Sequence, residues 1–169
     1  MSDTQADAIQ PIDPRDLRHA LGCFGTGVTI ITAQTADGRR AGLTANSFSS
    51  VSLNPPLVLW SLSVHSPSLA VFQEASHFAV NVLGAHQEDL ARQFARPSDN
   101  KFAGVDWRPG LGQAPVLADT VAHFQCRAGE RHYGGDHVIF LGAVEAYSHD
   151  GRDGLFFSRG AFGSFIAAG

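Results

Sequence analysis

The 169-residue sequence is poor in charge and in cysteine, and it has no long apolar run. Charged residues make up 17% of it, below the roughly 25% of ordinary soluble domains, which favours an oligomer with a buried self-contact over a serine- and glycine-rich monomer. Cys23 and Cys126 are too few for a disulfide scaffold, which favours a reducing cytoplasm. No run approaches the roughly 18 apolar residues of a membrane span, and MSDTQADAIQPID at the start has no signal-peptide core. We therefore expect a soluble, cytoplasmic protein without a membrane partner.

The charge balance excludes a second class of partner. The net charge is -4 and the pI is near 6.0, and no basic stripe is present that would displace counterions from phosphates. We therefore expect no nucleic-acid partner. A hydrophobic content of 44% suffices for one sizeable core, so we expect a single domain over residues 13–169. Residues 1–12 precede the first helical pattern, which begins at Asp13, and we expect them to form a flexible lead.

Turn signals and β-branched runs predict a mainly β domain. A short helix with one buried face is expected from Asp13 and Pro14 onward, where Leu17, Leu21 and Phe24 recur at helical spacing. Further helices are expected at 66–74, with Ser66 as the cap, and at 86–96, and a loop at 97–112. The expected strands are 26–34, 40–45, 57–62, 77–84 and two long strands around Gly134-Gly135, with a tail at 155–165 that alternates aromatic and small residues. Six or seven strands without a βαβ repeat favour a closed or nearly closed antiparallel barrel with short helices outside it.

Two familiar kinds of site are disfavoured by residue order and spacing. Gly22, Gly25 and Gly27 follow a predicted helix and precede a strand, whereas a dinucleotide fingerprint needs strand, glycine turn and then helix. His123 and Cys126 are three apart on a predicted strand and so point to opposite faces, which disfavours a metal site. We therefore expect neither a Rossmann site nor a bound metal.

The segment GLTANSFSSVSLNPP (42–56) is unusually polar yet carries no charge. It is either a solvated loop or a neutral hydrogen-bonding surface for a flat polar ligand. A flavin ring has a row of acceptors and one donor along its pyrimidine edge, which backbone amides and Ser, Thr or Asn side chains can satisfy. The flavin phosphate would then rest on hydroxyls and on the helix start at 66–68, where free amides favour an anion.

An ordered series of motifs gives the sequence a family resemblance. They are FGTGVTIIT (24–32), GLTANSFSSVSLNPPLV (42–58), SPSL (66–69), FAVNVL (78–83), DNKF (99–102) and GGDHVIFLGAV (134–144). Together they are similar to the short-chain flavin reductases, the reductase components of two-component flavin-dependent monooxygenases. The resemblance covers about residues 15 to 165. It implies an FMN-binding split barrel, a six-stranded antiparallel Greek-key-like barrel that forms a homodimer with flavin near the subunit interface.

The resemblance also assigns roles to individual residues. His137, in the GDH triplet, would face the nicotinamide and is the catalytic candidate; the alternative is a hairpin histidine bonded to backbone. Lys101 is either a phosphate contact or an exposed loop lysine, and Phe162 stands where the family usually has tyrosine. The expected cofactor-binding residues are Thr44, Ala45, Asn46, Ser47, Ser49, Ser50, Ser61, Ser66, Ser68, Lys101, Phe102, Arg159 and Phe162.

The implied activity is NAD(P)H:flavin oxidoreduction with supply of reduced flavin to a separate oxygenase. Hydride passes from nicotinamide C4 to flavin N5, so the protein must stack two rings and exclude water rather than provide an acid or base. The cofactors would be FMN or FAD and NADH or NADPH. The alternatives are a flavin carrier without fast reduction and an oxidase of the pyridoxamine-phosphate type, which would need cations that the 44–52 run lacks.

Overall fold

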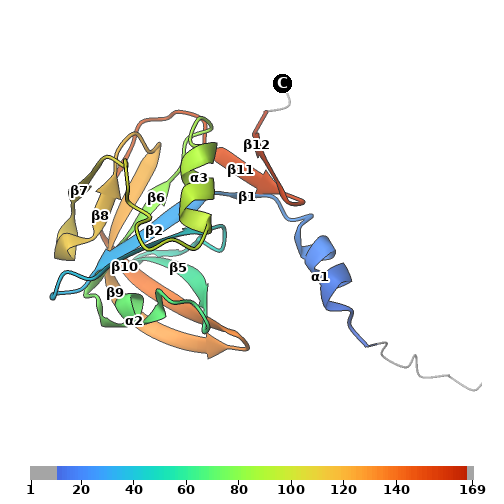
Figure 1. Cartoon of the computed structure of the whole chain (residues 1–169), viewed down its shortest axis with the longest axis horizontal. Helices are drawn as coiled ribbons and strands as arrows, with labels where there is room; N and C mark the ends of the chain where they lie inside the picture. Colours follow the sequence, from blue (N-terminus) through green and yellow to red (C-terminus); the bar gives the residue numbers. More distant parts are fainter. Residues whose placement is uncertain (1–10, 167–169) are drawn as a thin grey trace, which may run out of the picture.

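Antiparallel pairing organises most of the chain in the computed structural model, which describes residues 11–166 (Figure 1). Positions 1–10 of the predicted flexible lead and positions 167–169 of the predicted domain lie outside the described residues. In spatial order the main sheet contains β3 (Arg40–Ala45), β2 (Thr29–Gln34), β6 (His77–Val82), β9 (Ala122–Gly134), β10 (His137–His149), β5 (Pro56–Ser63) and β4 (Ser49–Leu53). The predicted turn at Asp37-Gly38 joins β2 to β3, and the predicted hairpin at Gly134-Gly135 joins β9 to β10.

Two smaller sheets and short helices complete the fold. One sheet contains β1 (Thr26–Gly27), β11 (Leu155–Ser158) and β12 (Ala161–Ser164), and the other contains β7 (Trp107–Pro109) and β8 (Pro115–Leu117). The helices are α1 (Pro14–Leu21), α2 (Leu69–Glu74), α3 (Glu88–Ala95) and the 3₁₀ turn η1 (Leu111–Gln113). Within residues 11–166, no helix has both the length and the apolar character that crossing a membrane requires.

The mainly β, split-barrel-like prediction is confirmed, with two local corrections. Ser49–Leu53 was not among the expected strands, but it forms strand β4 against β5 and extends the main sheet to seven strands. The second helix begins at Leu69 with Ser68 at its N-cap, not with Ser66. The Ser66 hydroxyl instead accepts a hydrogen bond from the Ser68 amide at 3.3 Å and forms the turn that precedes the helix.

Ser47 connects the chain to β5 just after Ala45, the last residue of β3 that pairs with β2. Ser47 lies in the connection between β3 and β4, and its hydroxyl donates to the carbonyl of Ser61 at 3.1 Å. The same oxygen accepts from the Ser61 amide at 3.0 Å, so both backbone groups of Ser61 are satisfied by one side chain. A hydroxyl can do this because it is donor and acceptor at once. The uncharged segment therefore links the end of β3 to β5, although the edge strands β3 and β4 of the sheet do not pair with each other.

The core is built around a buried aromatic cluster on β5 and β10. Trp60 is fully buried and stacks on Phe140 with 4.7 Å between ring centroids, while the edge of Phe72 from α2 packs at 4.8 Å. Such aromatic pairs add about 0.5–1.5 kcal/mol beyond their buried area. This cluster holds α2, and with it the turn at Ser66 and Ser68, against the sheet.

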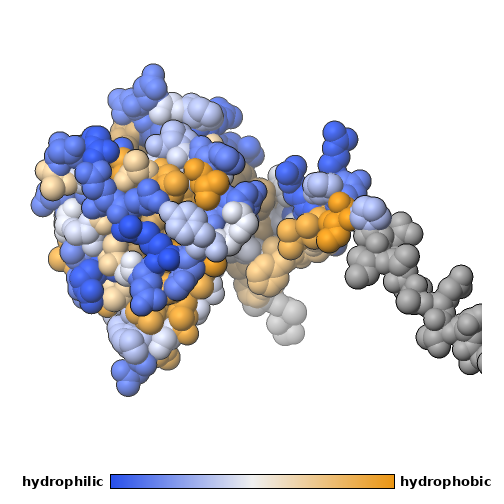
Figure 2. Space-filling model, turned by 90° about the horizontal axis from the view of Figure 1, so that it is seen from below, coloured by the Kyte–Doolittle hydropathy of each residue, from blue (hydrophilic) through white to orange (hydrophobic). Residues whose placement is uncertain are grey.

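The first helix departs from the sequence prediction in its burial. It forms over Pro14–Leu21 as expected, with the Asp13 carboxylate accepting from the Arg15 amide at 2.7 Å, but it buries no residue. Leu21 is 66% exposed and the following Phe24 is 80% exposed. The reason is position, because α1 projects away from the sheets at the end of β1 (Figure 1), and its apolar side forms a continuous hydrophobic surface (Figure 2).

Candidate functional site

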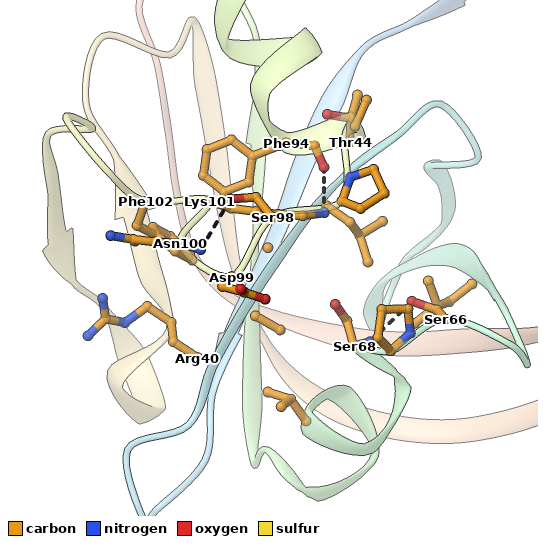
Figure 3. Close-up of a pocket in the computed structure, with 18 of the residues that line it drawn as sticks. Arg40, Thr44, Ser66, Ser68, Phe94, Ser98, Asp99, Asn100, Lys101 and Phe102 are labelled. Carbon is orange, nitrogen blue, oxygen red and sulfur yellow. Dashed lines mark hydrogen bonds between the residues drawn. The ribbon is translucent and has the colours of Figure 1, made fainter.

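A cavity of about 710 Å³ lies between β3, the turn before α2 and the loop after α3. Figure 3 shows Thr44 on one side of it, Ser66 and Ser68 on another, and Ser98 to Phe102 along the loop. Its volume is within the range of about 300–1,000 Å³ typical of small-molecule sites. Five predicted cofactor-binding residues line it, namely Thr44, Ser66, Ser68, Lys101 and Phe102.

The wall formed by β3 depends on close packing against α3. The Thr44 hydroxyl donates to the carbonyl of Ala91 at 2.6 Å, so this side chain fixes α3 against the strand. Two residues earlier, a Cβ on Gly42 would meet the ring of Phe94 at 2.5 Å and that of Phe102 at 3.1 Å. Only glycine therefore allows these rings to lie directly on β3.

The loop wall is held by backbone-directed bonds. The ammonium of Lys101 donates to the carbonyl of Phe94 at 2.8 Å, and the amide of Gln93 donates to the carbonyls of Lys101 and Ala103. Lys101 is partly buried, which contradicts the interpretation as an exposed loop lysine, and this burial lowers the pKa of its ammonium. The loop is therefore fixed against α3 by hydrogen bonds and forms an ordered wall of the cavity.

A second cavity of about 680 Å³ lies between the main body and the end of α1. Asn46 and Arg159, both predicted cofactor-binding residues, line it together with His19, Cys23 and Phe24. The amide of Arg159 donates to the carbonyl of Gly22 at 2.8 Å, which joins the β11–β12 turn to the end of α1. Because Thr44 lines the first cavity and Asn46 the second, the uncharged segment passes between the two.

The catalytic candidate His137 lies at the exposed tip of the β9–β10 hairpin, outside the lining of both cavities. Its Nδ1 is 2.7 Å from the carboxylate of Asp136. This hydrogen bond, followed by the attraction of the imidazole charge, holds the pKa of Asp136 below its usual range. His137 pairs with Ser63, near the turn that carries Ser66. A role toward nicotinamide stays a prediction for this residue.

The other six predicted cofactor-binding residues line neither of these two cavities. Ala45 is buried, and its carbonyl accepts from Thr29 at 2.7 Å. Ser49 and Ser50 lie on the exposed edge strand, and Phe162 packs beside Phe157 with Arg92 above its ring at 5.0 Å. The Ser47 hydroxyl is bonded to the backbone of Ser61, as described above. The structure brings five of the thirteen predicted residues to the first cavity and two to the second.

Sequence reasoning missed residues that complete the first cavity. Arg40, Phe94, Ser98 and Asn100 line it and were not predicted. Arg40 had a usable signal, because residues two apart on a strand share a face and Arg40, Gly42 and Thr44 are so spaced. Within residues 11–166, no group of three or more His, Cys, Asp or Glu side chains is placed to hold a metal ion.

Comparison with known proteins identifies the family to which this chain belongs. The flavin reductase like domain matches residues 21–165. A probable flavin reductase of Rhizobium meliloti is 46% identical over 150 residues, which are 89% of this chain and 48% of that protein. The FMN reductase (NADH) SmoA of Agrobacterium fabrum is 47% identical over 89% of this chain and 86% of its own length. The chain thus spans about half of the first relative and most of the second.

Solved structures agree with the sequence match. The NADH:FAD oxidoreductase SgcE6 of Streptomyces globisporus, in complex with NAD and FAD fragments, superposes with a TM-score of 0.86 at 42% identity. The superposition covers 93% of this chain and 97% of that one. The profile match over most of the chain and the identity to SmoA together establish that this chain belongs to the family of flavin reductase like domains.

Proposed function

We propose that this chain is an NADH-dependent flavin reductase that supplies reduced FMN or FAD to a separate oxygenase. The observation that carries the proposal is an uncharged segment whose Thr44 and Asn46 line two neighbouring cavities, in a chain 47% identical to an FMN reductase (NADH). Other relatives are named as reductase components of monooxygenases, including one for trigonelline in Acinetobacter baylyi. The two free cysteines support a reducing, cytoplasmic setting.

The first cavity fits an isoalloxazine with a phosphorylated side chain. Leu43, Val71 and Phe102 offer apolar surface to a ring, and Ser66 and Ser68 offer hydroxyls to the chain and phosphate. Bound flavin would supply the hydride acceptor. The residues of this chain would orient it, satisfy its polar edge and keep water from the ring faces.

The direct test is a turnover assay. Purified protein with NADH and excess FMN or FAD should lose absorbance at about 340 nm, the nicotinamide band, far above the rate without protein. A protein that binds flavin tightly but oxidises no NADH above background would contradict the proposal and indicate a carrier.

His137→Ala should raise the KM for NADH about tenfold and leave flavin affinity within about twofold. The reason is that an imidazole donating to the nicotinamide amide or to a phosphate contributes about 1.5–3 kcal/mol when charged. His132→Ala is the matched control, because His132 lies on the same hairpin opposite Ile139 and is also exposed. Equal losses of NADH and flavin affinity in His137→Ala would contradict the assigned role.

We further propose that the chain acts as a homodimer and that α1 takes part in the contact. The exposed Leu17, Leu21 and Phe24 give a hydrophobic surface that a second copy would cover, in line with the low charge content. Sedimentation should show a dimer at micromolar concentration, and Leu21→Glu should shift it to monomer. Leu111→Glu, at 39% exposure on η1, should leave it dimeric. A monomeric wild-type protein would refute this assignment.

A further inference from the structure

Arg40 is an exposed residue at the border of the first cavity, and its guanidinium lies against two aromatic rings. Its guanidinium carbon lies 4.3 Å from the centre of the Trp107 ring and 5.3 Å from that of Phe102. Its Nε donates to the side-chain oxygen of Gln34 at 3.0 Å, which fixes the rotation of the guanidinium. The planar guanidinium of arginine can stack on an aromatic face, whereas the ammonium of lysine contacts such a face as a compact point charge. The group is therefore oriented before any ligand arrives.

Within residues 11–166, no carboxylate forms an ion pair with Arg40, although that of Asp99 lines the same cavity. Its neighbour Arg39 pairs with Asp37 and Glu74, and Arg152 pairs with Asp119 and Asp150. In the part of the chain that the structure describes, Arg40 forms no ion pair, and its one hydrogen bond goes to a neutral amide. Its two terminal nitrogens thus keep donors that suit a phosphate.

Arg40 lies at the opposite side of the cavity from Ser66 and Ser68 (Figure 3). The cavity has one other lining cation, Lys101, and its ammonium is engaged by the carbonyl of Phe94. A ligand with its first phosphate near Ser66 and Ser68 would need a second anionic group to form an ion pair with Arg40. FMN has one phosphate, whereas FAD continues through a second phosphate into adenosine.

We propose that Arg40 binds the adenylate half of FAD, so that this chain binds FAD more tightly than FMN. The inference rests on the proposed flavin reductase function. The guanidinium donates hydrogen bonds to the phosphate on the adenosine side. The rings of Phe102 and Trp107 pack against the guanidinium and hold its orientation. A Lys side chain would offer only a mobile point charge there.

The test compares the affinities of oxidised FMN and FAD, measured by flavin fluorescence without nicotinamide, in Arg40→Gln and in the matched control Arg39→Gln. Arg40→Gln should weaken FAD about tenfold and change FMN by less than about twofold, which also shows that the variant is folded. Arg39→Gln should change neither, because Arg39 does not line the cavity. Wild-type affinity for FAD should fall more steeply with salt than affinity for FMN, and Arg40→Gln should remove that difference.

Several results would overturn the assignment. Equal weakening of FMN and FAD would place Arg40 at the phosphate that both share, and unchanged affinities would remove it from the site. A loss confined to the KM for NADPH, with NADH unchanged, would assign it to the 2′-phosphate of the nicotinamide dinucleotide. If Arg40→Gln does not fold, Arg40→Lys replaces it and should weaken FAD selectively but less. A wild-type protein that neither binds flavin nor oxidises NADH would instead refute the proposed function itself, and this inference with it.

Discussion

Replacing Asn81 by leucine should lower the free energy of unfolding by about 3 kcal/mol or more, the largest loss of stability that we expect from one uncharged substitution. Asn81 is fully buried on β6. Its amide nitrogen donates to the carbonyl of Ile30 at 3.0 Å and to the hydroxyl of Thr32 at 3.2 Å. Its oxygen accepts from the amide of Leu117 at 2.9 Å. One side chain thereby joins β2, β6 and β8.

The cost arises from what leucine leaves behind. The buried amide of Leu117 and carbonyl of Ile30 would each lose a partner, at about 1–3 kcal/mol for each unsatisfied group. The measurement is urea unfolding followed by far-UV circular dichroism. Asn100→Leu is the matched control, because Asn100 is exposed in the loop after α3 and should stay within about 0.5 kcal/mol of wild type. Equal stabilities of the two variants would show that the network of Asn81 is energetically unimportant.

The second large effect is expected at Gly42, where stability and ligand binding should fall together. The Cβ of Gly42→Ala would overlap the Phe94 ring at 2.5 Å, and Phe94 is fully buried, so the ring cannot turn into solvent. Overpacking of this kind costs about 1–3 kcal/mol. Phe94 and Phe102 both line the first cavity, so their displacement should also raise the Kd for flavin at least about tenfold, or about 1.4 kcal/mol.

Gly27→Ala is the control for this prediction. A Cβ at Gly27 meets nothing within 4 Å, and its φ is not in the left-handed region. Melting temperature and flavin affinity should both stay close to wild type for Gly27→Ala. If Gly42→Ala destabilised the protein but kept wild-type flavin affinity, the first cavity would not be where flavin binds.

The strongest elements of the fold were predictable because their patterns are local. The β-branched run of β2 and the alternation of β6 identify strands without tertiary information. Strand β4 was missed because its serines and the prolines that follow it are typical of a loop, and because four of its five residues are exposed, so that no buried face marks it as a strand. The helical spacing of apolar residues correctly predicted α1. The prediction that one face of this helix is buried was wrong, because α1 buries no residue against the rest of residues 11–166.

The site was predictable in composition but not in arrangement. The uncharged polar segment was predicted to be the centre of the site, and in the structure its Thr44 lines the first cavity and its Asn46 the second. The acceptor of Thr44 lies 47 residues away on α3, and that of Ser47 lies 14 residues away on β5. Such pairings depend on how strands and helices pack, so sequence alone could not separate hydroxyls that stabilise the fold from hydroxyls that face a cavity.

The bonds that tie residues 101–103 to α3 have a consequence for the timing of binding. The hydrogen bonds of Lys101 and Gln93 already order this loop when the chain folds. Ligand binding therefore does not include the unfavourable conformational entropy of ordering the loop. Preorganisation of this kind allows entry and departure without a slow loop rearrangement. In the proposed reductase, which would take up oxidised flavin and release the reduced form in every cycle, such a wall would favour rapid exchange.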